Sequence, residues 1–235
     1  MQYLVIVPTY NESENIKNLI KQLVNAELDC LFIDDGSPDN TADLISKSNF
    51  YNSKVFLINR ESKKGYATAC LEGFTYGLDK GYDYIIQMDA DFSHSVSDLE
   101  KMIPFSNNYD LVIGSRYTKG GKTLGWGLFR TNLSKYANIF ARLMTRSKIK
   151  DLTSGFRIYK STTLKQLNLL DISSEGYGFL VEVLDKILRS NSLIKEVPIT
   201  FNDRKFGESK MSYRVILDGI KTTSKIGFRN FKLLQ

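Results

Sequence analysis

The sequence predicts an α/β fold in which a mostly parallel sheet is covered by helices on both faces. Three observations support this: apolar, strand-like runs alternate with helical patterns, the connections between them are short, and polar clusters follow the expected strand ends. The 235 residues are 42% hydrophobic and 25% charged, which is ordinary globular composition and excludes a disordered or collagen-like chain. No repeat or long linker divides the chain, so we expect one domain over residues 1–235.

The first half alternates strands and helices in order. Residues 3–8 (YLVIVP) are a continuous apolar run typical of a buried strand, and apolar residues at helical spacing predict a helix over 12–26. Further elements follow: a strand over 30–34, a short helix ending near residue 47, a strand over 54–59, a helix over 65–78, and strands over 84–88 and 110–114.

After residue 115 the alternation is less regular. An amphipathic helix is expected over 132–146, with basic residues flanking its apolar side, and it either faces the core or lies in an anionic membrane interface. Residues 194–201 predict a strand whose Pro198 indicates a sheet edge, and a final amphipathic helix begins near Ser212.

The charged residues are unevenly distributed. Residues 1–115 contain 9 Lys or Arg and 17 Asp or Glu, whereas residues 116–150 contain 9 Lys or Arg and no acid. This pattern favours a protein that handles a cation and several phosphates. The alternative is a non-enzymatic basic module that binds nucleic acid or anionic lipid, and salt-sensitive DNA binding without nucleoside diphosphate binding would favour it.

Membrane spans and secretion are not indicated. The longest uncharged run, Met1–Asn11, is far shorter than the ~18 apolar residues that cross a bilayer. It also lacks the basic start and cleavage site of a signal peptide. Cys30 and Cys70 have no metal-binding spacing, so we expect reduced core cysteines in a cytoplasmic protein.

Three polar clusters follow expected strand ends: Pro8–Glu12, Asp34–Asp35 and Asp89–Asp91. Ligands of open parallel sheets bind outside the carboxyl ends of the strands, so these clusters should meet in space. Neither a G-x-G-x-x-G turn nor a G-x-x-x-x-G-K-[ST] loop is present, which argues against nicotinamide-binding and P-loop proteins.

Asp89-Ala90-Asp91 is the sharpest local feature. Two carboxylates one residue apart after a buried strand can hold Mg²⁺ or Mn²⁺ together with phosphate oxygens, and Ser93 can add a hydroxyl. Asp35 is expected to meet a ribose hydroxyl or a base edge while Asp34 caps the following turn; the alternative is capping by both.

Phosphate contacts are expected from arginine and lysine. The guanidinium fork matches phosphate bidentately, and the candidates are Arg116, Arg130, Arg204 and Lys210, whereas Lys205 is expected to be a solvated surface residue.

The single histidine and the single tryptophan allow two interpretations each. His94 follows the aspartate pair, and we expect it to be packed in a loop rather than to act as a general base. Trp126 lies between two glycines and is either an exposed aromatic in a mobile loop or a buried anchor.

Six segments together resemble the family 2, GT-A-fold glycosyltransferases, and within them the polyprenol (dolichol) phosphate mannose synthases. They are VIVPTYNE at 5–12, IDDGSPDNTA at 33–42, MDADFSH at 88–94, GSRY at 114–117, LTSGFRIY at 152–159 and FNDRKFGESKMS at 201–212. The resemblance covers nearly the whole chain. The last two segments are the most specific to the polyprenol-phosphate branch.

The resemblance implies inverting transfer of mannose from GDP-mannose to a polyprenyl phosphate, with Mg²⁺ or Mn²⁺ as cofactor and without nucleic acid. It implies nucleotide-sugar contacts at Pro8, Tyr10, Glu12, Ile33, Asp35, Asp89, Ala90, Asp91, Arg116, Arg204 and Lys210. The cation contacts would be Asp89, Asp91 and Ser93, and the catalytic residues Asp91, Arg116 and Arg130, with the two arginines cradling the acceptor phosphate.

The resemblance also implies a division of labour within the chain. Residues 1–115 would bind the nucleotide sugar, and residues 116–235 would bind the acceptor and carry basic amphipathic helices. Without later transmembrane helices the chain resembles the short form, which acts at the cytoplasmic membrane face or with an anchored partner subunit. Transfer of glucose from UDP-glucose, or of another nucleotide hexose, to a lipid phosphate is the alternative.

Two departures from the family pattern stand out. Asn40 occupies a position where glycine is common, and Asn tolerates the left-handed conformation. Tyr66-Ala67 replaces a more usual Leu-Gly and affects the local loop.

Overall fold

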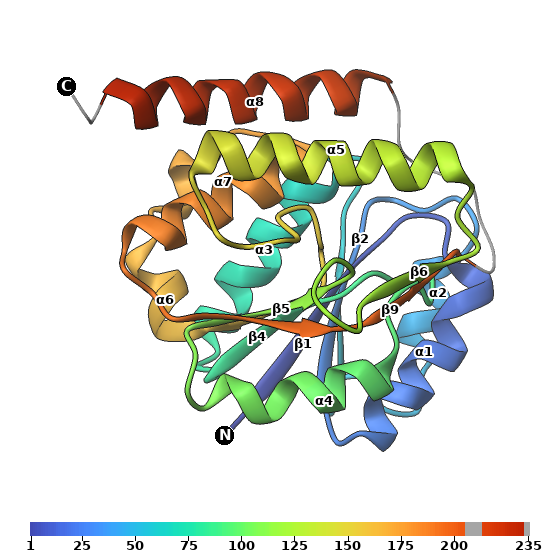
Figure 1. Cartoon of the computed structure of the whole chain (residues 1–235). Helices are drawn as coiled ribbons and strands as arrows, with labels where there is room; N and C mark the ends of the chain where they lie inside the picture. The colour runs from blue at the N-terminus through green and yellow to red at the C-terminus, as the bar shows by residue number, and fades with distance from the viewer. Residues whose placement is uncertain (205–212, 233–235) are drawn as a thin grey trace.

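The predicted sheet is present and has seven strands in the order β3-β2-β1-β4-β7-β5-β8 in the computed structural model, which describes residues 1–204 and 213–232 (Figure 1). The strands are β1 (Tyr3–Thr9), β2 (Asp29–Asp34), β3 (Val55–Asn59), β4 (Tyr84–Gln87), β5 (Leu111–Ser115), β7 (Arg157–Lys160) and β8 (Ile194–Pro198). The expected parallel pairing holds for β1 with β2 and β4, for β2 with β3, and for β5 with β8.

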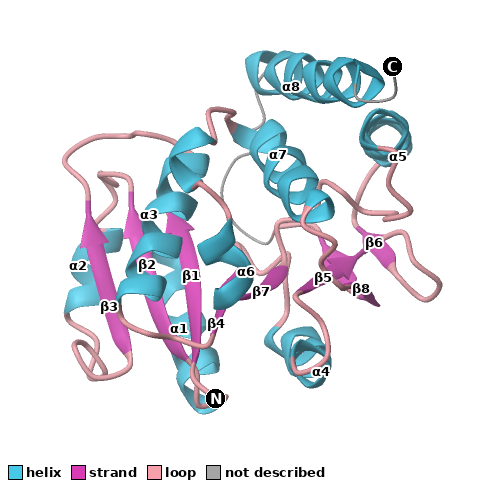
Figure 2. Ribbon diagram, turned by 90° about the vertical axis from the view of Figure 1, so that its left-hand side faces the viewer, coloured by secondary structure: helices cyan, strands magenta, loops and turns pink. Residues whose placement is uncertain are grey.

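Helices cover both faces of this sheet, as predicted. Side chains alternate along β1, so that Leu4 and Ile6 join one core cluster and Val5 and Val7 join the other. The first cluster is covered by α3 (Tyr66–Asp79), α6 (Ser161–Gln166) and α7 (Gly176–Arg189), and the second by α1 (Ser13–Asn25), α2 (Thr41–Ser46) and α4 (Val96–Ser106) (Figure 2). A short 3₁₀ helix, Leu169–Asp171, follows α6.

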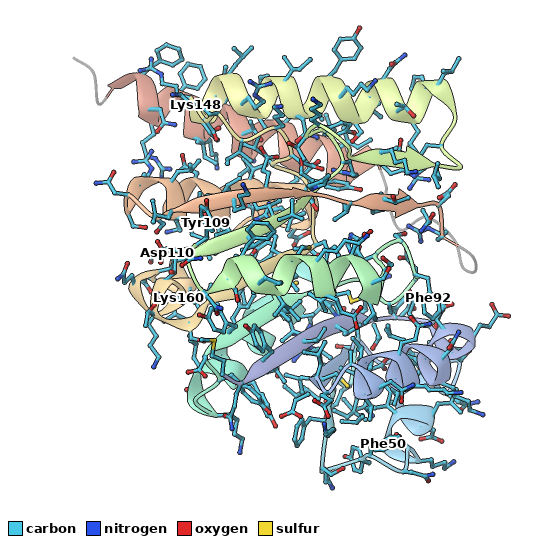
Figure 3. All side chains as sticks on the ribbon, turned by 60° about the horizontal axis from the view of Figure 1, so that its bottom comes forward. Phe50, Phe92, Tyr109, Asp110, Lys148 and Lys160 are labelled. Atoms are coloured by element: carbon cyan, nitrogen blue, oxygen red, sulfur yellow. The ribbon has the colours of Figure 1, made fainter. Side chains whose placement is uncertain are left out.

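The antiparallel strand β7 is absent from the sequence prediction. It lies between β4 and β5, and Arg157 is opposite Gln87 on one side and Ile113 on the other. Figure 3 shows the consequence: Asp110, before β5, and Lys160, at the end of β7, lie together at one end, while Phe92, after β4, lies at the other. The start of β7 therefore lies at the edge where β4 and β5 end.

The single strand predicted over residues 194–201 is wrong, because the chain changes sheets there. β8 ends at Pro198, and β9 (Thr200–Asn202) pairs with β6 (Lys122–Leu124) in a separate ribbon. Ile199 makes the transition: its N–H donates to the Ser115 carbonyl and its own carbonyl accepts from Lys122. The expected edge position of Pro198 is confirmed, since β8 ends the sheet order.

Two long helices lie side by side along one side of the molecule (Figures 1 and 2). They are α5 (Leu128–Thr145) and α8 (Tyr213–Lys232), and α8 also packs on α7. Among the helices of residues 1–204 and 213–232, none combines the length and apolarity needed to cross a bilayer. Cys30 and Cys70 are both buried and unpaired with each other, as expected.

Candidate active site

The three polar clusters meet in one cleft of ≈ 340 Å³ at the carboxyl edge of the sheet. Most of the residues singled out from the sequence line it: Pro8, Tyr10, Glu12, Asp35, Asp89, Ala90, Asp91, Arg116, Arg130 and Arg204. Ile33 and Ser93 are buried and do not line it, and Lys205 and Lys210 lie outside the described residues.

The loop after β1 is held by the turn that follows β2 and by the start of α2. The Asn11 N–H donates to the Ser37 hydroxyl at 2.9 Å, and the Glu12 N–H donates to the Thr41 hydroxyl at 3.0 Å. Glu12 is the residue before α1, and its carboxylate accepts from the Asn15 amide at 2.8 Å. These contacts fix the direction in which the loop faces the cleft.

Asp34 and Asp35 have different functions in the structure. Asp34 is fully buried and caps the turn, accepting from the Ser37 N–H at 2.8 Å, from the Ser37 hydroxyl at 2.6 Å and from the Thr9 hydroxyl at 3.0 Å. Asp35 lines the cleft and accepts from Arg60 and from the Gly65 N–H, each at 2.8 Å. Asp35 thereby ties the start of α3 to the end of β2.

Asp89 and Asp91 present carboxylates to the cleft with 35% and 11% of their side chains exposed. The turn after them is tight, because Phe92 adopts a left-handed φ of 59° and the Ser93 N–H donates to Asp91 at 3.0 Å. Arg204 approaches the other Asp91 oxygen at 3.7 Å.

The donor set limits which metal fits. Within the described part of the chain no group of three or more His, Cys, Asp or Glu residues could enclose a metal ion. Two carboxylates fit a cation such as Mg²⁺, which commonly takes one or two carboxylates and completes its shell with substrate phosphates and water. The site therefore fits a metal that enters with a diphosphate.

His94 is packed rather than poised for proton transfer. Its ring is 2% exposed and stacks on Phe156 with centroids 4.6 Å apart, and its Nδ1 accepts from the Asp89 N–H at 3.2 Å. Burial lowers the pKa of His94 despite the nearby carboxylates. This agrees with the expectation of a packed loop histidine.

Two of the arginines in the basic block of residues 116–150 are each paired with an aspartate. Arg116 is buried against Asp151 through two hydrogen bonds of 2.8 and 2.7 Å, and Arg130 contacts Asp203 at 2.8 Å. The guanidinium of Arg130 also lies 4.3 Å from the ring centroid of Trp126. Trp126 is thus a half-buried part of the cleft wall, and its indole N–H has no hydrogen-bond partner among the described residues.

A second cavity of ≈ 280 Å³ adjoins the first between α5, α7 and α8. Apart from a few polar residues its walls are apolar, with Leu133, Phe140, Val181, Ile216 and Ile220 among them. The two cavities share five residues: Arg116, Trp126, Arg130, Thr153 and Tyr177. A polar cleft and an apolar groove therefore meet at the two paired arginines.

Several cleft residues were not found by sequence reasoning. Lys63 lies 3.8 Å over the Tyr10 ring, Lys64 precedes α3, Tyr66 is the first residue of α3, and Tyr177 lies in the first turn of α7. Burial raises the pKa of Tyr66 well above its ordinary value. At these positions the sequence had only one unusual feature, Tyr66-Ala67 in place of the Leu-Gly expected from the family resemblance.

Comparison with known proteins identifies relatives over most of the chain. The model of the family described as glycosyl transferase family 2 matches residues 4–167. An undecaprenyl-phosphate mannosyltransferase of Micrococcus luteus is 38% identical over 97% of this chain and 94% of its own length. A polyprenol monophosphomannose synthase of Mycolicibacterium smegmatis is 36% identical over 96% of this chain and 87% of its own length.

Solved structures support the fold. Glucosyl-3-phosphoglycerate synthase of Mycobacterium tuberculosis superposes with a TM-score of 0.68 at 17% identity, over 95% of this chain and 80% of that one. At this identity the likeness shows the shared architecture alone.

Proposed function

The chain belongs to glycosyltransferase family 2, and on that premise we propose that it transfers mannose from GDP-mannose to a polyprenyl phosphate. The observation that carries the proposal is the junction of the two cavities. A polar cleft with two carboxylates suits a sugar diphosphate, an apolar groove suits a lipid tail, and Arg116 and Arg130 lie where the two reactive groups would meet. Residues 1–115 are then the donor half, and residues 116–235 the acceptor half.

The reaction is a direct displacement. An oxygen of the acceptor phosphate forms a bond to the anomeric carbon, the bond to the diphosphate breaks, and the configuration inverts. The second pKa of a phosphate monoester is about 6, so the acceptor is largely a dianion at neutral pH and needs no general base. The packing of His94 is consistent with this.

Charge compensation is the main contribution of the protein. Asp89 and Asp91 would hold Mg²⁺ or Mn²⁺, which when bound supplies positive charge to the leaving diphosphate, and the Ser93 N–H would support the Asp91 carboxylate. Arg204, together with Lys210 from outside the described residues, would contact the diphosphate, and Arg116 and Arg130 would cradle the acceptor phosphate.

The nucleotide would occupy the end of the cleft formed by the first two clusters. Pro8, Tyr10 and Glu12 would surround it, and Asp35 would accept hydrogen bonds from the base or ribose. Ile33, which is fully buried, would support this end of the cleft without touching the nucleotide.

The side formed by α5 and α8 would lie on the cytoplasmic face of an anionic membrane. Large apolar side chains protrude there, with Leu128, Phe129 and Phe228 each more than 70% exposed. Basic residues accompany them: Lys135, Arg142, Arg146, Lys221, Lys225 and Arg229. Exposed apolar groups with flanking cations bind anionic lipid surfaces, and the apolar groove opens between these helices.

One incubation tests donor, acceptor and class together. The protein is mixed with membranes, Mg²⁺ and a panel of labelled nucleotide sugars, and label is expected in a mild-acid-labile lipid phosphate from GDP-mannose alone. Label from UDP-glucose would instead support the alternative hexose. Incorporation into no lipid would refute the proposal, and co-purification from membranes tests for an anchored partner subunit.

An aspartate variant tests the cation assignment. Asp91→Ala is expected to abolish transfer while leaving the far-UV circular dichroism spectrum unchanged. Asp79→Ala, at the exposed end of α3, is the control and should retain full turnover. Full turnover by Asp91→Ala would refute the assignment.

A further inference from the structure

We propose that a buried chain of hydrogen bonds from Arg157 through Tyr159, Gln87 and Tyr66 orients the Asp89 carboxylate, which makes Tyr66 a positioning residue for cation binding. The inference rests on the proposed function, because it takes Asp89 as a cation ligand. Its members come from β7, β4 and the start of α3; Arg157, Tyr159 and Gln87 are each 0% exposed, and Tyr66 lines the cleft.

Arg157 is the fixed first member of this series of hydrogen bonds. Its side chain is 0% exposed and donates to three backbone carbonyls, those of Leu152, Ser154 and Leu180, at 2.7 to 2.9 Å. No carboxylate among the described residues forms an ion pair with it. A fourth donor of the guanidinium reaches the Tyr159 hydroxyl at 3.4 Å.

The direction of every proton in the chain follows from Arg157. Arginine can only donate, so the Tyr159 oxygen accepts and its own proton goes to Gln87 Oε1 at 3.0 Å. The Gln87 Nε2 must then face the other way, where it donates to the Tyr66 oxygen at 2.7 Å and to Cys70 Sγ at 3.4 Å. The remaining proton of Tyr66 points to Asp89 Oδ1 at 3.4 Å.

The phenol of Tyr66 is held in place by two further contacts. Its ring packs edge-on against Phe179, with centroids 6.3 Å apart. Its hydroxyl fills space that Gly155 leaves, since a Cβ built on Gly155 would fall 2.7 Å from that oxygen. A leucine at position 66 would have no hydroxyl, so the last link to Asp89 requires the tyrosine.

The hydrogen bonds of this series all point from Arg157 toward Asp89. Hydrogen bonds in series polarise one another, so the charge of Arg157 is relayed as a stronger donor at Tyr66. A carboxylate fixed at one oxygen presents the other in a defined direction. Partners that orient metal ligands in this way typically contribute 10–100-fold to metal affinity.

The test measures Mn²⁺ affinity in the presence of GDP, by electron paramagnetic resonance of the free ion. Tyr66→Phe keeps the ring and removes only the hydroxyl, and we expect Mn²⁺ to bind about 10-fold more weakly. Tyr82→Phe is the matched control, because Tyr82 donates to Asp29 at 2.9 Å at the opposite edge of the sheet, and it should bind Mn²⁺ as the parent does.

A double-mutant cycle tests the relay itself. Tyr159→Phe breaks the chain two links earlier, so it should weaken Mn²⁺ binding by itself and add little to Tyr66→Phe. Fully additive effects, or equal affinity of the parent and Tyr66→Phe, would overturn the inference while leaving the proposed function intact. A parent protein that binds no Mn²⁺ would overturn the cation assignment and this inference with it. If Tyr159→Phe does not fold, the comparison of Tyr66→Phe with its control decides.

Discussion

Removing the negative charge of Asp151 tests how Arg116 is held between the two cavities. Asp151 is 0% exposed, and its oxygens accept from Arg116 Nε and Nη2 at 2.8 and 2.7 Å. In Asp151→Asn one oxygen becomes an NH₂ group facing a guanidinium that has only donors. Arg116 keeps its 2.8 Å hydrogen bond to Thr153 but loses its counter-charge.

The expected loss of unfolding free energy is about 3–5 kcal/mol, the cost of removing one partner of a buried pair. One lost charge-assisted hydrogen bond accounts for about 1.5–3 kcal/mol, and the uncompensated buried charge accounts for the rest. Burial opposes the charge of Arg116, but Asp151 outweighs it and raises the arginine pKa above its ordinary value, so the guanidinium stays charged. Urea unfolding, followed by circular dichroism, measures the difference in unfolding free energy between the parent and Asp151→Asn. The two proteins should unfold with equal m values, so that the shift in midpoint reports stability alone.

The matched control makes the same chemical change at the surface. Asp43 pairs with Lys47 at 3.7 Å, and the two side chains are 65% and 76% exposed, so Asp43→Asn should leave the unfolding midpoint unchanged. A loss below about 1 kcal/mol for Asp151→Asn, or one equal to the control, would refute the view that the pair is interdependent.

Three further predictions concern the packing around the site. Burial raises the pKa of Cys30 to about 12 and the pKa of Cys70 well above its ordinary value. Neither thiol should therefore react with a disulfide reagent near pH ~8 until the protein is unfolded. Reaction of the folded protein would contradict this. Gly77→Ala should cost about 1–3 kcal/mol in urea unfolding, since the new methyl group would lie 2.6 Å from Ile85, and a gain in stability would be the opposing result. Burial raises the pKa of Asp39, but hydrogen bonds at the starts of α1 and α2 outweigh it and hold this pKa below its ordinary value. Asp39→Asn should therefore cost about 1 kcal/mol near neutral pH, and the difference from the parent should vanish as the pH falls below ~4, through the pKa of the folded state; a difference that persists in acid would count against it.

The first part of the sheet was predictable because β1, β2 and β4 are buried on both faces. β1 is a continuous apolar run, β2 and β4 are short and mostly apolar, and the polar residues that follow these strands mark the sheet edge. The rule that ligands bind at the carboxyl ends of parallel strands then brought Tyr10, Asp35 and Asp91 together without any long-range information.

The rest required contacts that the local pattern does not contain. β7 reads RIYK, and its arginine is buried only because three carbonyls from elsewhere in the chain accept its protons. The helix α7 begins with Gly-Tyr-Gly, which resembles a loop, and α4 contains Pro104. Tyr66 looked like a loop anomaly, because its partners Gln87 and Asp89 are more than 20 positions away.

The position of β7 has a consequence for how the protein is made. β4 and β5 do not pair with each other, because β7 lies between them. β7 is hydrogen-bonded to β4 on one side and to β5 on the other. A nascent chain that has emerged only as far as β5 has no partner for that strand, and its N–H and C=O groups must stay in water. The seven-stranded sheet is complete only after residues 157–160, and then β8, have left the ribosome, so β5 joins the sheet later than β1 to β4, which pair with one another.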